Sequence, residues 1–166
     1  MAYITSTQFE ALLKKQKERK AKRKIKANEL WCHAISRKGL VKKLDSLFSI
    51  FARLRAKKLT GGKCELFEVP HNNCGGIECA FHYITRSKYA TRWDHRNIAG
   101  ACFSANMRYE HDQTFISAIM DWFKKKYGIS CWDQMVFDSN HTKKWSNSDL
   151  EEKYREIKSR VEGMNG

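Results

Sequence analysis

CAFHYITRSKYATRWDHRNIAGACFSANMRYEHD, residues 79–112, is the stretch of sequence that decides the predicted fold. Residues 77–84 are β-like, and residues 97–101 can form a partner strand across a basic, aromatic loop. Helix is expected to resume at about Cys102, which places Asn106 on the first turns of that helix. The stretch therefore predicts a β-hairpin followed by an α-helix, and with it an α+β fold.

Helices are predicted on both sides of this unit. Leucine and phenylalanine recur at helical spacing over residues 40–58, and the glycines of residues 60–62 end that helix. A second helix is expected over residues 113–127, with Asp112 as its N-cap and Gly128 at its end. The apolar stripes of both helices are interpreted as core.

Two further helices are predicted near the C-terminus. Ser130 is expected to cap a short helix. The last helix is expected to begin near Ser148, where S-D-L-E makes a capping box with Glu151.

Positive charge is concentrated in the N-terminal third. The formal net charge is +14, and residues 1–60 hold 17 Lys/Arg against 4 Asp/Glu. Residues 6–27 are expected to form a projecting helix, which predicts a basic arm over residues 1–38 and a domain over residues 39–166. Such charge suits nucleic-acid phosphates, with an anionic membrane surface and a solvated helix face as alternatives. The arm residues expected to bind nucleic acid are Lys14, Lys15, Lys17, Arg19, Lys20, Lys22, Arg23, Lys24 and Lys26.

Two classes of protein are excluded by the sequence pattern. No run of about 18 apolar residues is present, so no membrane span is expected. The N-terminus lacks the basic start and continuous apolar segment of a signal peptide. The six cysteines are therefore expected in a reducing cytoplasm, where clustered cysteines more often indicate metal binding or buried thiols than disulfides.

Several motifs agree in order and spacing with one nuclease family. They are His82-Tyr83, Thr85-Arg86, Arg92-Trp93-Asp94-His95-Arg96-Asn97 and Cys102-Phe103-Ser104-Ala105-Asn106. Over roughly residues 40–162 the chain resembles the NinG (Rap) recombination nucleases of lambda-like phages, which are of the HNH, or ββα-metal, type. The resemblance implies a small HNH-like core, derived from a treble clef and surrounded by helices.

The resemblance also implies hydrolysis of phosphodiester bonds in branched or single-strand-containing DNA. His82 is then the general base, because a histidine at a strand end can accept a proton from water near neutral pH. Asn97 fixes the loop and orients His82, and Asn106 offers its amide oxygen to Mg²⁺ or Mn²⁺. Glu78 or Asp94 adds a carboxylate to this catalytic ion. The residues that grip flanking phosphates are Arg86, Lys88 and Arg92.

The chain departs from the family at its zinc site. The family carries two Cys-x-x-Cys pairs, whereas residues 64–67 and 102–105 here read CELF and CFSA. A rebuilt site can use Cys64, His71, Cys74 and Cys102, because His71-Asn72-Asn73-Cys74 has the spacing of metal ligands. The alternative is that zinc is absent and that Phe67 and Ala105 form an apolar plug.

Two functions are consistent with these patterns. The first is a metal-dependent DNA endonuclease of phage recombination, acting in the cytoplasm of a bacterial host. Its partners would be DNA and a second copy of the chain or other phage recombination proteins. The second is an inactive relative that binds DNA or RNA in a phage nucleic-acid complex. Phe81 motivates this second hypothesis, because it replaces the family's glycine and removes one metal ligand of many HNH enzymes.

Overall fold

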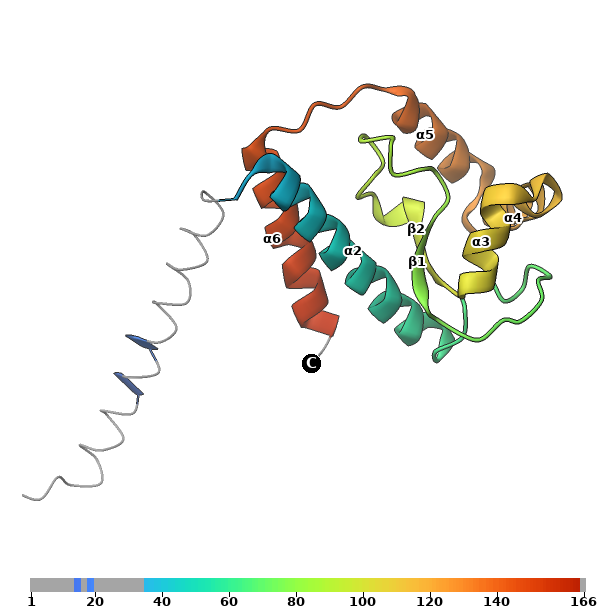
Figure 1. Cartoon of the computed structure of the whole chain (residues 1–166), viewed down its shortest axis with the longest axis horizontal. Coiled ribbons are helices and arrows are strands. Elements are labelled where there is room, and N and C mark those ends of the chain that lie inside the picture. The colour runs from blue at the N-terminus through green and yellow to red at the C-terminus, as the bar shows by residue number, and fades with distance from the viewer. Residues whose placement is uncertain (1–13, 16–17, 20–34, 165–166) are drawn as a thin grey trace, which may run out of the picture. The chain divides into compact units, whose positions relative to one another are not determined.

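The computed structural model describes residues 14–15, 18–19 and 35–164 (Figure 1). The chain divides into two compact units, Met1–Leu40 and Val41–Gly166. Residues 14–15 and 18–19 of the basic arm are helical and exposed, and they include Lys14, Lys15 and Arg19. The rest of the helix predicted over residues 6–27 lies outside the described residues. So do the other basic residues named for the arm, which are Lys17, Lys20, Lys22, Arg23, Lys24 and Lys26.

The predicted α+β fold is confirmed for residues 35–164, which contain five α-helices and one antiparallel hairpin (Figure 1). A single 3₁₀ turn, η1, precedes the second strand. In chain order the elements are α2 (Arg37–Thr60), β1 (Cys79–His82), η1 (His95–Asn97), β2 (Ile98–Ala101), α3 (Phe103–His111), α4 (Gln113–Tyr127), α5 (Ile129–Asn140) and α6 (Asn147–Met164).

The hairpin joins two layers of helix. Cys79 pairs with Ala101 and His82 pairs with Ile98, so the strands are in register over their whole length. Gly100 faces α2, because a Cβ at this position would lie 2.4 Å from the Cβ of Ala56. Only glycine allows the strand to approach the helix so closely.

The other face of the hairpin contacts the helices that follow it. Phe81 is 1% exposed, and its ring lies edge-on against Tyr83 and Tyr109, at centroid distances of 5.2 Å and 4.7 Å. Phe115 and Phe123 of α4 belong to the same buried cluster. Successive residues of a strand point to opposite faces, so the neighbours of Phe81 in β1 face α2.

The predicted end of α2 is confirmed at Thr60, and both predicted caps of α4 are confirmed. Asp112 accepts a hydrogen bond from the N–H of Phe115 and begins α4, which ends at Gly128 as predicted. The predicted cap at Ser130 is wrong, because α5 begins directly after Gly128 without a side-chain cap.

The capping box predicted for the last helix is also in the wrong register. Ser146 and Asp149 exchange the two hydrogen bonds, at 2.7 Å and 3.1 Å. Glu151, the acid expected there, is buried at 8% exposure and lies 3.5 Å from Arg155. The helix therefore begins at Asn147, before the predicted box.

Candidate functional site

Three cysteines and one histidine converge beside the start of α3. The sulfur atoms of Cys64, Cys74 and Cys102 and a ring nitrogen of His71 all lie within 4.8 Å of one another. Cys64 and Cys102 are buried, His71 is half-buried and Cys74 is exposed. In a tetrahedral site with Zn–S bonds of ~2.3 Å, the ligand atoms lie roughly 3.8 Å apart. The cluster can therefore hold a metal ion such as zinc.

Hydrogen bonds orient these ligand atoms. Nδ1 of His71 lies 2.6 Å from a backbone carbonyl, which leaves Nε2 facing the Cys102 Sγ at 3.1 Å. The Cys64 Sγ accepts from the N–H groups of Leu66 and Cys102, at 3.4 Å and 3.3 Å. The Cys102 Sγ accepts from the N–H of Ala105 and caps α3. Contacts of this kind surround metal ligands in proteins, because they fix the ligand's direction and tautomer.

The surroundings of Cys64 favour a neutral thiol when no cation is bound. Burial, aided by the thiols of Cys102 and Cys74, raises the pKa of Cys64 to about 12. A cysteine binds a metal as the thiolate, so a bound cation must offset this burial and release protons. The donor set of sulfur and imidazole suits zinc in a closed, structural site.

Phe67 and Ala105 do not form the apolar plug that was the alternative to a zinc site. Phe67 is 47% exposed, and Lys63 Nζ lies 5.7 Å from the centre of its ring. Ala105 alone is buried. Phe67 therefore leaves the space beside Cys64 to the cysteine and histidine side chains.

Asn97 holds the two ends of the hairpin loop together. It is 0% exposed, and its Oδ1 accepts from the N–H of Ile84 at 2.6 Å. Its Nδ2 donates to the carbonyls of Ile84 and Thr91, at 2.9 Å and 3.0 Å. Every polar atom of this amide therefore serves the loop that separates β1 from β2.

His82 ends β1 on the face that contacts α2. Its ring centroid lies 6.4 Å from that of Phe48, and its ring makes a hydrogen bond to the backbone of Arg92. Burial, with a further contribution from the Arg86 charge, lowers the pKa of His82 to about 4. Asp45 opposes this change. The imidazole is therefore neutral at pH 7 and half-buried.

The carboxylates implied for a catalytic ion occupy separate places. Glu78 accepts the N–H of Phe103 at 2.7 Å, after β2, whereas Asp94 accepts the N–H of Arg96 at 2.8 Å, before β2. A strand of four residues spans roughly 13 Å. Glu78 and Asp94 therefore cannot bind the same ion, and each already accepts a hydrogen bond from a backbone N–H. Asn106 is half-buried on the first turn of α3.

The basic side chains of the loop are either exposed to solvent or paired with other groups of the protein. Arg86 and Lys88 are exposed. Arg92 instead contacts Asp45 at 2.6 Å through Nη2, and its Nη1 donates to the carbonyl of Arg86. Trp93 Nε1 donates to the same Asp45, and this tryptophan is 2% exposed. Trp93 therefore belongs to the core, and Arg92 supports the loop through its contacts with Asp45 and Arg86.

Two acids that the sequence reasoning passed over hold this region together. Asp45 is the single acid of α2 and binds Arg92 and Trp93. Glu65 is 1% exposed, accepts the N–H of Gly100 at 2.9 Å and lies 3.4 Å from Arg55. The signal for Asp45 was present, since a lone acid in a basic amphipathic helix commonly has a partner.

The comparisons with known proteins are negative: no protein-family model, curated protein or solved structure matches the chain. Among the described residues, no helix combines the length and apolar character needed to cross a bilayer.

A zinc ion held by this cluster is expected to stabilise the protein. Because the four ligands join the loop after α2 to α3, treatment with a strong zinc chelator should lower Tm by several degrees, and re-addition of Zn²⁺ should restore it. Cys74→Ser should weaken metal retention by at least tenfold, measured by competition with a chromogenic chelator. Cys131→Ser, a half-buried cysteine outside the cluster, is the matched control. An equal loss of metal from both variants would contradict the assignment.

The low pKa of His82 predicts a pH-dependent stability. Between its unfolded pKa of ~6.5 and its folded pKa of about 4, the unfolded chain binds more protons, so stability falls as pH falls. Between pH 7.5 and pH 5, the free energy of unfolding of the wild type should fall by about 2 kcal/mol more than that of His82→Gln. Urea unfolding at both pH values measures this. A difference that stays constant with pH would show that the imidazole is not buried in its neutral form.

Proposed function

We propose that the protein binds nucleic acid, and that an HNH-like ββα unit stabilised by one structural zinc ion is the core of its binding domain. The observation that carries the proposal is the loop between β1 and β2. Its backbone is fixed by the buried Asn97, while the side chains of Arg86 and Lys88 are exposed. A rigid loop that presents cations can contact phosphates without ordering first.

The charge distribution supports the same proposal. Residues 1–60 hold 17 Lys/Arg against 4 Asp/Glu, and the described arm residues Lys14, Lys15 and Arg19 are exposed. Lys42, Arg53 and Lys57 of α2 are also exposed. Such cations release condensed counterions when they contact phosphates, which favours association. The resemblance to NinG-type nucleases makes branched DNA the first ligand to test.

Cys64, His71, Cys74 and Cys102 would hold the zinc ion, which would stabilise the fold rather than take part in catalysis. Four protein ligands would leave no open position for water or substrate. The chain's own residues do the rest: the Cys102 sulfur caps α3, and Asn97 holds the loop.

Endonuclease activity is the second candidate, and the Asn97 amide favours it. The resemblance implies that this residue fixes the loop beside His82, and the three hydrogen bonds of its side chain do hold that loop. Against this stand the buried Phe81 and the low pKa of His82, which makes the imidazole a weak base. Glu78 and Asp94 lie at opposite ends of β2, so they do not share one catalytic Mg²⁺.

Binding should depend on salt through the loop cations. On branched DNA, log affinity should fall linearly with log salt concentration between roughly 50 and 200 mM. The double variant Arg86→Ala/Lys88→Ala should reduce the magnitude of that slope by about 1 to 2, because each phosphate contact contributes roughly 0.9. The control is Arg155→Ala/Lys158→Ala on α6, whose charges lie near Glu151 and Glu162. If both double variants change the slope equally, the loop is not the binding surface.

The second candidate is tested by cleavage. Wild type and His82→Gln are incubated with branched DNA and Mg²⁺ or Mn²⁺, and binding is measured in parallel. Endonuclease activity requires products with the wild type and at least a hundredfold slower cleavage with the variant. DNA that both proteins bind and neither cuts would reject hydrolysis and leave the binding function in place.

A further inference from the structure

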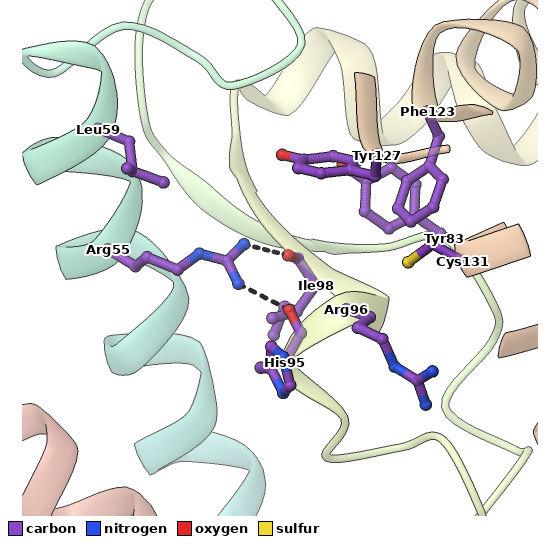
Figure 2. A pocket seen from close by; sticks show the side chains of 9 residues that line it. All are labelled: Arg55, Leu59, Tyr83, His95, Arg96, Ile98, Phe123, Tyr127 and Cys131. Carbon is purple, nitrogen blue, oxygen red and sulfur yellow. Dashed lines mark hydrogen bonds between the residues drawn. The ribbon is translucent and has the colours of Figure 1, made fainter. Parts of the chain in front are cut away.

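A pocket of about 260 Å³ lies between α2, η1 and the helices α4 and α5 (Figure 2). Its walls are largely apolar and aromatic, with Tyr83, Phe123 and Tyr127 on the side opposite Arg55. Arg55 donates from Nη1 to the carbonyl of His95 at 2.7 Å, and from Nη2 to the carbonyl of Ile98. The guanidinium is therefore fixed at the pocket by backbone contacts.

Two polar atoms among the residues that line this pocket have no hydrogen-bond partner in the described part of the chain. They are the hydroxyl of Tyr83 and Nε of Arg55, and both are buried. Tyr83 as a whole is 4% exposed. Buried donors almost always have an acceptor, so two unpaired donors on residues that line one pocket favour a ligand that supplies an oxygen acceptor. The ligand group implied is an oxygen acceptor on an otherwise apolar, planar body.

A second pocket, of about 280 Å³, shares His95 and Arg96 with the first. It adds Lys143 and Lys153, together with Trp145, whose ring centre lies 3.9 Å from Lys143 Nζ. Arg96 is itself paired with Asp94 and Asp138. Lys153 is also paired, with Glu156 at 2.8 Å. Lys143 is therefore the cation that this second pocket offers to a ligand, while the first pocket is aromatic.

We propose that the two pockets together hold one unpaired nucleotide of single-stranded nucleic acid. The base enters the aromatic pocket, where a carbonyl oxygen accepts from Tyr83 and Arg55, and the adjacent phosphate lies beside Lys143. This inference rests on the proposed function and specifies the ligand as unpaired rather than duplex nucleic acid.

The size and lining of the aromatic pocket support this choice. Its volume is below the roughly 300–1,000 Å³ of sites for drug-sized ligands, which suits a single planar ring system. Stacking on aromatic side chains is how proteins hold unpaired bases. A free anion would not suit a cavity whose walls include Leu59, Ile98 and Phe123.

The test compares two oligonucleotides of equal length, one of thymidines and one with an abasic site in place of every base. Both carry the same phosphates, so their affinity ratio isolates the contribution of the bases. Wild type should prefer the thymidine oligonucleotide, and Tyr83→Phe should reduce that preference about 3- to 10-fold through loss of one hydrogen bond. The variant should be as stable as the wild type, because no hydrogen bond within the chain is lost.

Two control variants separate the pocket from general effects. Tyr109→Phe removes a hydroxyl that donates to the carbonyl of Tyr83 at 2.7 Å, so it should lower stability and leave the base preference intact. Lys143→Ala should weaken the binding of both oligonucleotides by the same factor, because both carry the same phosphates.

The results separate the base pocket from nucleic-acid binding in general. Equal affinity of the wild type for both oligonucleotides, or an unchanged preference in Tyr83→Phe, would overturn the base pocket while nucleic-acid binding stands. Failure to bind single-stranded, duplex or branched nucleic acid at low salt would overturn both.

Discussion

A hairpin of two four-residue strands is too short to be stable by itself, and the surrounding structure supplies what it lacks. Gly100 allows β2 to lie against Ala56 of α2, while Phe81 anchors the opposite face in the aromatic core. Asn97 fixes the loop end of the hairpin. At the other end, Cys102 leads directly into α3 and belongs to the cysteine and histidine cluster. The position of every candidate functional side chain depends on these supports.

The same supports divide the surface into different chemical environments. The loop fixed by Asn97 exposes Arg86 and Lys88, whereas the pocket behind η1 is aromatic and holds unpaired donors. His82 lies against Phe48, and its lowered pKa follows from burial and the nearby Arg86. These features favour recognition of nucleic acid over its hydrolysis, because recognition requires neither a shared catalytic ion nor a basic imidazole.

Local sequence signals predicted the hairpin and α4, because each has a short-range pattern, and Asp112 and Gly128 bracket α4. For the metal-ligand set, the resemblance to the NinG family pointed to Cys64 and Cys102, and the local spacing of His71 and Cys74 supplied the other two residues of the cluster. The box at α6 was misplaced because Ser146 and Ser148 are each followed three residues later by an acid, and both registers satisfy the pattern. Long-range contacts were out of reach. Nothing local shows that Asp45 meets Arg92 across 47 residues, or that Arg55 and Tyr83 share a pocket.

The zinc K-edge X-ray absorption spectrum of the protein as purified is the most direct test of whether the cysteine and histidine cluster binds zinc. Three sulfur neighbours at ~2.3 Å and one nitrogen at 2.0–2.1 Å are predicted, matching the three cysteines and one histidine of the cluster. A protein that contains no zinc, or a zinc ion surrounded only by oxygen and nitrogen, would contradict it.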